Sequence, residues 1–149
     1  MGLDMYLTKE TYVKRWEHQT DADLHEVSVK KGGEAHPTIQ TNRISGVVEE
    51  VMYWRKANAI HGWFVDNCQD GQRTHVSVEQ LKELRDLCQR VILDKQPELL
   101  PPREGFFFGS KEVDDWYYSD LADTVAQLDK ELDGKGDEYG VDYYYRSSW

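Results

Sequence analysis

The residues best suited to chemistry form one run of twelve, residues 53–64, with the sequence YWRKANAIHGWF. The run holds four aromatic side chains, two cations, an asparagine and a histidine, and no acid, although the whole chain has a formal net charge of −10. A run that only filled a core would not need four polar side chains, and one that only faced water would not need two tryptophans. We therefore expect an element that packs on one side and presents polar groups on the other.

Each of these side chains has a definite chemical use. A histidine such as His61 can exchange a proton near neutral pH and so act as an acid or a base. Arg55 can hold a phosphate or a carboxylate through two parallel hydrogen bonds. Tyr53 and Trp54 can stack on a flat ring such as a nucleobase. The alternative is that Asn58 and His61 only tie down neighbouring backbone while the tryptophans fill the core.

Two further runs gather most of the remaining aromatic side chains. Fifteen of the eighteen aromatics lie in residues 53–64, 106–118 and 139–149. Such runs often build core, but if the three converge they form a pocket for a small molecule, and a nucleotide-like ligand is one hypothesis. Its predicted ligand-binding residues are Tyr53, Trp54, Arg55, Asn58, His61, Trp116, Tyr144 and Arg146. On a strand, Tyr144 and Arg146 share one side, and because Tyr and Arg are favoured at interfaces, a homodimer is a further hypothesis.

The usual signatures of catalysis are missing from the sequence. It has no phosphate-binding P-loop, no dinucleotide-binding glycine pattern and no nucleophile elbow. The five histidines and two cysteines are scattered, and no spacing among them matches a zinc or iron site. We therefore predict no cofactor, no metal and no catalytic residue, and expect binding rather than an enzymatic reaction. A metal-independent hydrolase that uses His61 with Arg55 or Lys56 is the alternative.

Charge is unevenly distributed along the chain. Residues 111–142 hold eleven acids against three lysines, a net of −8. General nucleic-acid binding is therefore disfavoured, because contact with phosphates needs clustered cations. The acidic stretch fits a solvated face, and the sharper alternative is an interaction module or decoy that meets a basic partner. No run approaches the roughly 18–20 apolar residues of a membrane span, so no membrane association is expected.

The candidate residues need a scaffold, and the hydrophobic pattern predicts its strands. Leu3, Met5 and Leu7 alternate with polar residues, as in a half-buried strand, and residues 139–146 alternate in the same way. Shorter strands are expected within residues 26–31, 38–44, 45–52, 73–76 and 105–110, the first two joined as a hairpin around two glycines.

Three helices are expected between the terminal strands. They cover residues 53–68, a segment that starts at Ser77 with a capping box to Gln80, and residues 115–132. The first helix would bring Trp54, Asn58 and His61 onto one face. The chain is thus predicted to form one α+β domain, in which both terminal strands are neighbours in a mostly antiparallel sheet packed with about three helices.

Several motifs also resemble a family of small uncharacterised proteins of bacteriophages and prophages. They are MGLDMYL at the N-terminus, YWRKANAIHGWF, LLP at residues 99–101, GFFFGS at residues 105–110, WYY at residues 116–118 and the final SSW. The resemblance implies a phage accessory protein in the cytoplasm of a bacterial host. It makes the binding of a host bacterial protein in counter-defence an expectation. No activity is established for that family, so the resemblance carries over no catalytic residue.

Overall fold

The N-terminal strand lies inside the sheet, between partners from distant parts of the chain. The computed structural model describes residues 2–68, 73–105 and 109–149. In it β1 (Asp4–Tyr12) pairs with β4 (Gly46–Arg55) on one side and with β6 (Val141–Ser148) on the other, and β5 (Thr74–Val76) pairs with β6. All three pairings are antiparallel and the strand order is β4-β1-β6-β5. The predicted α+β domain with neighbouring terminal strands is therefore confirmed.

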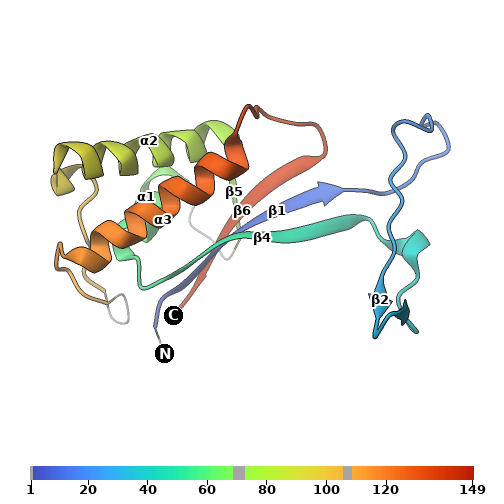
Figure 1. Ribbon diagram of the computed structural model, residues 1–149, viewed down its shortest axis with the longest axis horizontal. Coiled ribbons are helices and arrows are strands. Elements are labelled where there is room, and N and C mark those ends of the chain that lie inside the picture. Colours follow the sequence, from blue (N-terminus) through green and yellow to red (C-terminus); the bar gives the residue numbers. More distant parts are fainter. Residues whose placement is uncertain (1, 69–72, 106–108) are drawn as a thin grey trace.

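Three helices cover one face of this sheet: α1 (Asn58–Asn67), α2 (Val78–Asp94) and α3 (Asp115–Leu132) (Figure 1). The start of β1 and the residue before it pack against them through alternate side chains, because alternate residues of a strand point to the same face. Leu3, Met5 and Leu7 are all completely buried. The core thus lies between the helical layer and the inner face of the sheet, as the period-two pattern predicted.

The second helix begins where the sequence predicted, directly after Ser77. The Ser77 hydroxyl accepts a hydrogen bond from the Gln80 N–H at 3.1 Å, and the Gln80 side chain accepts one from the Ser77 N–H at 2.9 Å. Five side chains of one face are buried: Val78, Leu81, Leu84, Cys88 and Val91. Burial raises the pKa of the Cys88 thiol to about 12, so this cysteine acts as a small packing residue.

The third helix is fastened to the sheet by a buried hydrogen bond. The Asp114 side chain caps α3 by accepting from the Tyr117 N–H at 3.1 Å. Two turns further, the Trp54 indole N–H donates to the Thr124 hydroxyl at 2.7 Å. Because Trp54 lies on β4 and is only 3% exposed, this bond joins the edge strand to α3 inside the core.

The predicted helix over residues 53–68 is wrong in its first five residues. Tyr53, Trp54 and Arg55 belong to β4, and the helix begins only at Asn58. Pairing explains the difference, since Arg55 still lies opposite Asp4 in the ladder with β1. The chain then turns at Lys56, which adopts a left-handed backbone conformation with φ of 56°. A strand sends neighbouring side chains to opposite faces, so Trp54 is buried while Tyr53 is 45% exposed.

Residues 13–45 project away from the sheet as an arm (Figure 1). The arm holds a short hairpin of β2 (Lys30–Lys31) and β3 (Glu34–Ala35) and a 3-10 helix, η1 (Thr41–Arg43). The turn formed by Gly32 and Gly33 is as predicted. The two hairpin strands are shorter than expected, and the second does not cover residues 38–44. The expected strand at residues 105–110 includes residues 106–108, which lie outside the described residues, and Gly105, Gly109 and Ser110 have no regular structure.

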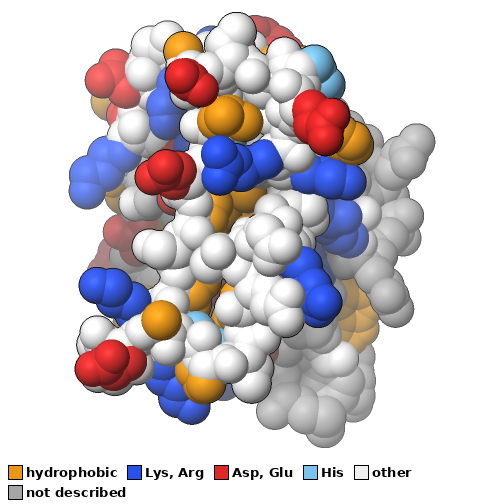
Figure 2. Space-filling view, turned by 90° about the vertical axis from the view of Figure 1, so that its right-hand side faces the viewer, with side chains coloured by type: hydrophobic (Ala, Val, Ile, Leu, Met, Phe, Trp, Pro, Cys, Tyr) orange, Lys and Arg blue, Asp and Glu red, His pale blue; other side chains and the backbone are white. Residues whose placement is uncertain are grey.

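Polar residues dominate the arm. Of residues 13–45, all of which the structure describes, only Val13 is buried. Figure 2 views this end of the molecule, where Lys and Arg side chains stand among acidic ones around a hollow with apolar side chains in it. The arm therefore contributes little to the core, which belongs to the sheet and the three helices.

The cap of α2 makes a measurable contribution to stability. Replacing Ser77→Ala removes the side-chain acceptor of the Gln80 N–H and should lower the free energy of unfolding by about 1 kcal/mol in chemical denaturation. Ser119→Ala is the matched control, because Ser119 is exposed inside α3, where alanine is the better helix former. Equal stability of the two variants would contradict the capping role.

Candidate functional site

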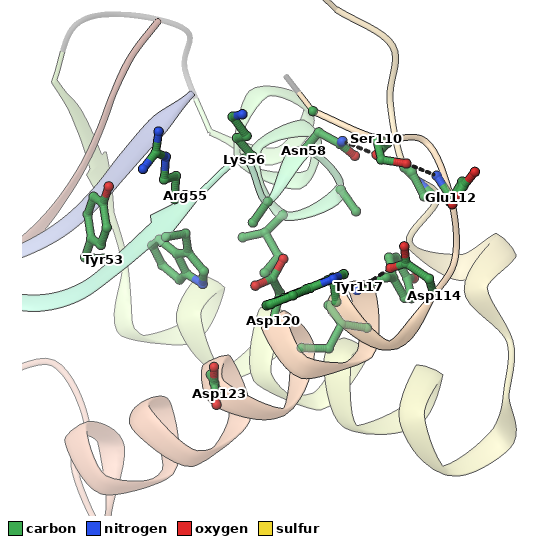
Figure 3. Close-up of a pocket in the computed structure, with 18 of the residues that line it drawn as sticks. Tyr53, Arg55, Lys56, Asn58, Ser110, Glu112, Asp114, Tyr117, Asp120 and Asp123 are labelled. Atoms are coloured by element: carbon green, nitrogen blue, oxygen red, sulfur yellow. Dashed lines mark hydrogen bonds between the residues drawn. The ribbon is translucent and has the colours of Figure 1, made fainter. Parts of the chain in front are cut away.

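A cavity of about 480 Å³ lies between the end of β4, the start of α1 and the first half of α3 (Figure 3). Its size falls in the usual range for small-molecule sites. Buried apolar side chains form its inner wall: Trp54, Ala57, Ala59, Ile60 and Leu121. Residues 109–114 add a further wall through Gly109, Ser110, Glu112 and Asp114. The cavity therefore joins two stretches that are far apart in the sequence, residues 52–60 and 109–123.

Two cations, Arg55 and Lys56, line the cavity at the end of β4. The Lys56 side chain is closely packed by two glycines. A Cβ added at Gly2 would lie 2.9 Å from Lys56 Cε, and one added at Gly109 would lie 3.0 Å from Lys56 Cβ. Gly109 also has φ of +87°, a conformation that disfavours other residues. Because neither glycine has a side chain, the backbone approaches Lys56 closely and restricts the aliphatic part of its side chain to the edge of the cavity.

Four carboxylates line the other side: Glu112, Asp114, Asp120 and Asp123. In Figure 3 they come from α3 and the loop before it, across from Arg55 and Lys56. Asp120 is half-buried, and its pKa is raised to about 6, first because burial penalises the charged carboxylate and then because Asp123 and Asp114 repel it. The cavity therefore has a cationic side and an acidic side, separated by an apolar wall.

Asn58 lines the cavity and also connects two loop positions to α1. Its side-chain oxygen accepts a hydrogen bond from the Arg103 N–H at 3.0 Å, and its amide donates to the Ser110 carbonyl at 2.8 Å. The Arg103 side chain crosses α1 at Gly62, where an added Cβ would overlap Arg103 Nε, and it forms an ion pair with Asp66. Asn58 thus holds both ends of residues 103–110 against the helix.

His61 points into the core. The side chain is 5% exposed, and its Nδ1 lies 2.7 Å from the Tyr145 hydroxyl. The Tyr145 ring stacks on Phe64 with ring centroids 3.8 Å apart. Burial raises the pKa of Tyr145 far above its ordinary value, so the phenol stays neutral in this contact. His61 therefore joins α1 to β6, and it does not line the cavity.

Tyr144 and Arg146 lie on the sheet face away from the helices. Arg73 stacks over the Tyr144 ring at 3.6 Å, and Arg146 lies over the Tyr6 ring at 4.8 Å. Strand alternation explains the position, since Tyr143 and Tyr145 occupy the buried face of β6. Neither of these two predicted residues lines the cavity.

The cavity brings together five of the eight residues that the sequence suggested. These are Tyr53, Trp54, Arg55, Asn58 and Trp116, whereas His61, Tyr144 and Arg146 lie elsewhere. The expected common face of Trp54, Asn58 and His61 is wrong, because Trp54 is on a strand.

The acidic side of the cavity was not predicted from the sequence. Asp120 follows Trp116 by four residues and precedes Asp123 by three, which places the three on one side of a helix. That spacing was the available signal for this part of the site. Its meaning depended on knowing which side of α3 faces β4.

The remaining acids of residues 111–142 are partly balanced by cations from other segments. Glu131 pairs with Lys9 at 3.3 Å, and Asp129 pairs with Arg85 at 3.5 Å. Other acids, such as Asp115 and Asp133, are exposed. The stretch is therefore a mixture of paired acids, solvent-facing acids and the acids of the cavity.

Comparisons with protein-family models, with curated proteins and with solved structures give no match. Within residues 2–68, 73–105 and 109–149, no group of three or more His, Cys, Asp or Glu side chains is arranged to hold a metal ion. Among the helices of those same ranges, none combines the length and the apolar character needed to cross a membrane. The cavity itself is therefore the feature from which a function can be proposed.

The two hydrogen bonds of Asn58 can be tested through stability. Asn58→Ala leaves the Arg103 N–H and the Ser110 carbonyl without this partner and should cost about 2–3 kcal/mol in chemical denaturation. Hydrogen exchange at the Arg103 N–H should accelerate in the same variant. Asn42→Ala, in the exposed part of the arm, is the control and should stay within about 0.5 kcal/mol. Unchanged exchange at Arg103 would rule out the connecting role.

The raised pKa of Asp120 predicts a definite pH dependence. Because the folded protein binds this proton more tightly than the unfolded chain, the stabilisation is complete below pH 4 and is lost as the pH rises through about 6. Asp120→Asn should therefore match the wild type at pH 4 and exceed it by about 1 kcal/mol at pH 7, a figure reduced for solvent screening. Thermal unfolding across this pH range provides the measurement. Asp133→Asn, at the exposed end of α3, is the control and should not gain stability over the wild type between pH 4 and pH 7.

Proposed function

We propose that the protein binds a small organic molecule, or a short segment of a host protein, in the cavity between β4, α1 and α3. The observation that carries the proposal is the combination of a buried apolar wall with charged groups of both signs around one space. Sites of this kind use the apolar surface for affinity and a few polar groups for orientation. Trp116, which is 80% exposed at the edge of the cavity, offers a further flat surface for contact.

The resemblance to small phage proteins extends the proposal to a biological setting. The protein would be a phage-encoded accessory protein in the bacterial cytoplasm, and its ligand or host partner would belong to a host defence response. The sequence suggested a nucleotide-like ligand, which in this cavity would place its phosphates beside Arg55 and Lys56 and its base against Trp116. Self-association through the face that carries Tyr144 and Arg146 is compatible with this function, because neither of these two residues lines the cavity.

An acidic interaction module is the second candidate function. It is favoured by the exposed carboxylates of α3 and of the loop after it, such as Asp115, Asp133 and Asp137. The ion pairs of Glu131 and Asp129 with Lys9 and Arg85 reduce the charge available to a partner. A hydrolase that uses His61 receives less support, because the imidazole is buried against Tyr145 and does not line the cavity.

Binding in the cavity can be tested with a panel of bacterial metabolites that includes nucleotides. A ligand of this site should shift the NMR signal of the Trp116 indole N–H, and Trp116→Ala should weaken its binding about tenfold or more. Arg55→Ala should weaken anionic ligands selectively. Both side chains are exposed, so these variants should keep the fold.

Trp16→Ala is the matched control for Trp116→Ala. Trp16 is a partly exposed tryptophan in the arm, outside the set of cavity-lining residues, and its removal should leave affinity unchanged. A panel in which no compound shifts the Trp116 signal would contradict the proposed binding of a small molecule. Equal effects of the two tryptophan variants would contradict the assignment of binding to this cavity.

A further inference from the structure

The charge around the cavity suggests which class of ligand it accepts, an inference that rests on the proposed function. Its lining includes four carboxylates and two cations. The cations both come from the end of β4, whereas the carboxylates come from α3 and the loop before it. A ligand in the cavity therefore meets an excess of negative charge on the helical side.

Asp120 is the carboxylate that would gain most from a positively charged ligand. It is half-buried, and the charges that act on it, from Asp123 and Asp114, are both repulsive. A cation beside this carboxylate would relieve the repulsion and repay part of the cost of burying its charge. An anion in the same position would add a third repulsion.

Trp116 supplies a second contact suited to a cation. It precedes Asp120 by four residues in α3, so the two side chains share one side of the helix. The face of an indole ring attracts ammonium and guanidinium groups more strongly than other aromatic faces do. An exposed tryptophan beside a partly buried carboxylate thus offers a cation both a π surface and an ion pair.

We propose that the cavity selects a ligand with a compact organic cation, an ammonium, amidinium or guanidinium group, held between Trp116 and Asp120. An anionic group on the same ligand would lie toward Arg55 and Lys56, so a zwitterion fits both sides. The cation belongs either to a free small molecule or to a Lys or Arg side chain of a host protein. A nucleotide is disfavoured, since its phosphates would be attracted only by Arg55 and Lys56 and repelled by the carboxylates of α3 and the loop before it.

Three probes with the same ring and nearly the same size test the proposal: benzamidine, benzamide and benzoate. They carry charges of about +1, 0 and −1 at pH 7 and are compared by NMR titration of the Trp116 indole N–H. Benzamidine should bind at least tenfold more tightly than benzamide, and benzoate should bind most weakly. Asp120→Asn should remove most of the advantage of benzamidine and leave benzamide unchanged. Asp133→Asn makes the same change of charge about 20 Å along α3 and should alter neither.

The pH profile separates an electrostatic role of Asp120 from a purely structural one. Benzamidine affinity should fall as the pH is lowered from 7 to 5, because protons compete for the Asp120 carboxylate. Benzamide affinity should stay flat over the same range. In Asp120→Asn the benzamidine profile should become flat as well.

The outcomes separate the ligand class from the proposed function. Benzoate or benzamide binding at Trp116 as tightly as benzamidine would overturn the cation preference and leave the cavity as a binding site. Failure of all three probes to shift Trp116, with no hit from the metabolite panel, would overturn both. If benzamidine binds as expected, methylguanidine and an end-blocked Gly-Arg-Gly peptide distinguish the sources: tighter binding of the peptide indicates a protein side chain, and equal binding indicates a free small molecule.

Discussion

The turn at Lys56 is the constraint on which the rest of the structure depends. Its left-handed conformation, with φ of 56°, costs a residue other than glycine about 1–3 kcal/mol. That cost is offset by a hydrogen bond of 2.7 Å from the Lys56 N–H to the Leu3 carbonyl and by close packing between Gly2 and Gly109. Because the chain changes direction here, β4 stays paired with β1 to its last residue and α1 begins beside the sheet. The cavity lies next to this turn.

Two polar residues after the turn, Asn58 and His61, lie on a buried helix and connect it to other parts of the fold. Asn58 is 4% exposed and His61 is 5% exposed, yet each has a partner on another element. Asn58 binds both ends of residues 103–110, and His61 contacts the Tyr145 hydroxyl on β6. A buried polar group without a partner costs about 1–3 kcal/mol, so these pairings favour one arrangement of helix, loop and strand over others. The residues that look most chemical in the sequence thus include those that assemble the fold.

The cavity gains its two-sided charge from the way α3 meets β4. The Trp54–Thr124 hydrogen bond fixes the helix against the strand, and Tyr117 adds a second attachment by donating to the Leu100 carbonyl at 2.6 Å. These contacts turn one side of an acidic helix toward the cations at the end of β4. The acidic stretch is therefore divided between ion pairs, solvent and the cavity. This arrangement therefore supports the recognition of a charged small molecule better than it supports attraction of the whole acidic stretch to a basic partner.

The sequence by itself determined what depends on local pattern. The alternation of Leu3, Met5 and Leu7 and the capping box at Ser77 each specify an element through neighbours in the chain. So does the helical spacing of the apolar residues of α3, Tyr117, Leu121, Leu128 and Leu132, and together these patterns predicted an α+β fold with adjacent terminal strands. Only the tertiary structure decided where β4 ends, because pairing of Arg55 with Asp4 overrides the helical tendency of the residues that follow. It also decided which side chains share the cavity, since the face on which a residue lies depends on whether it belongs to a strand or a helix.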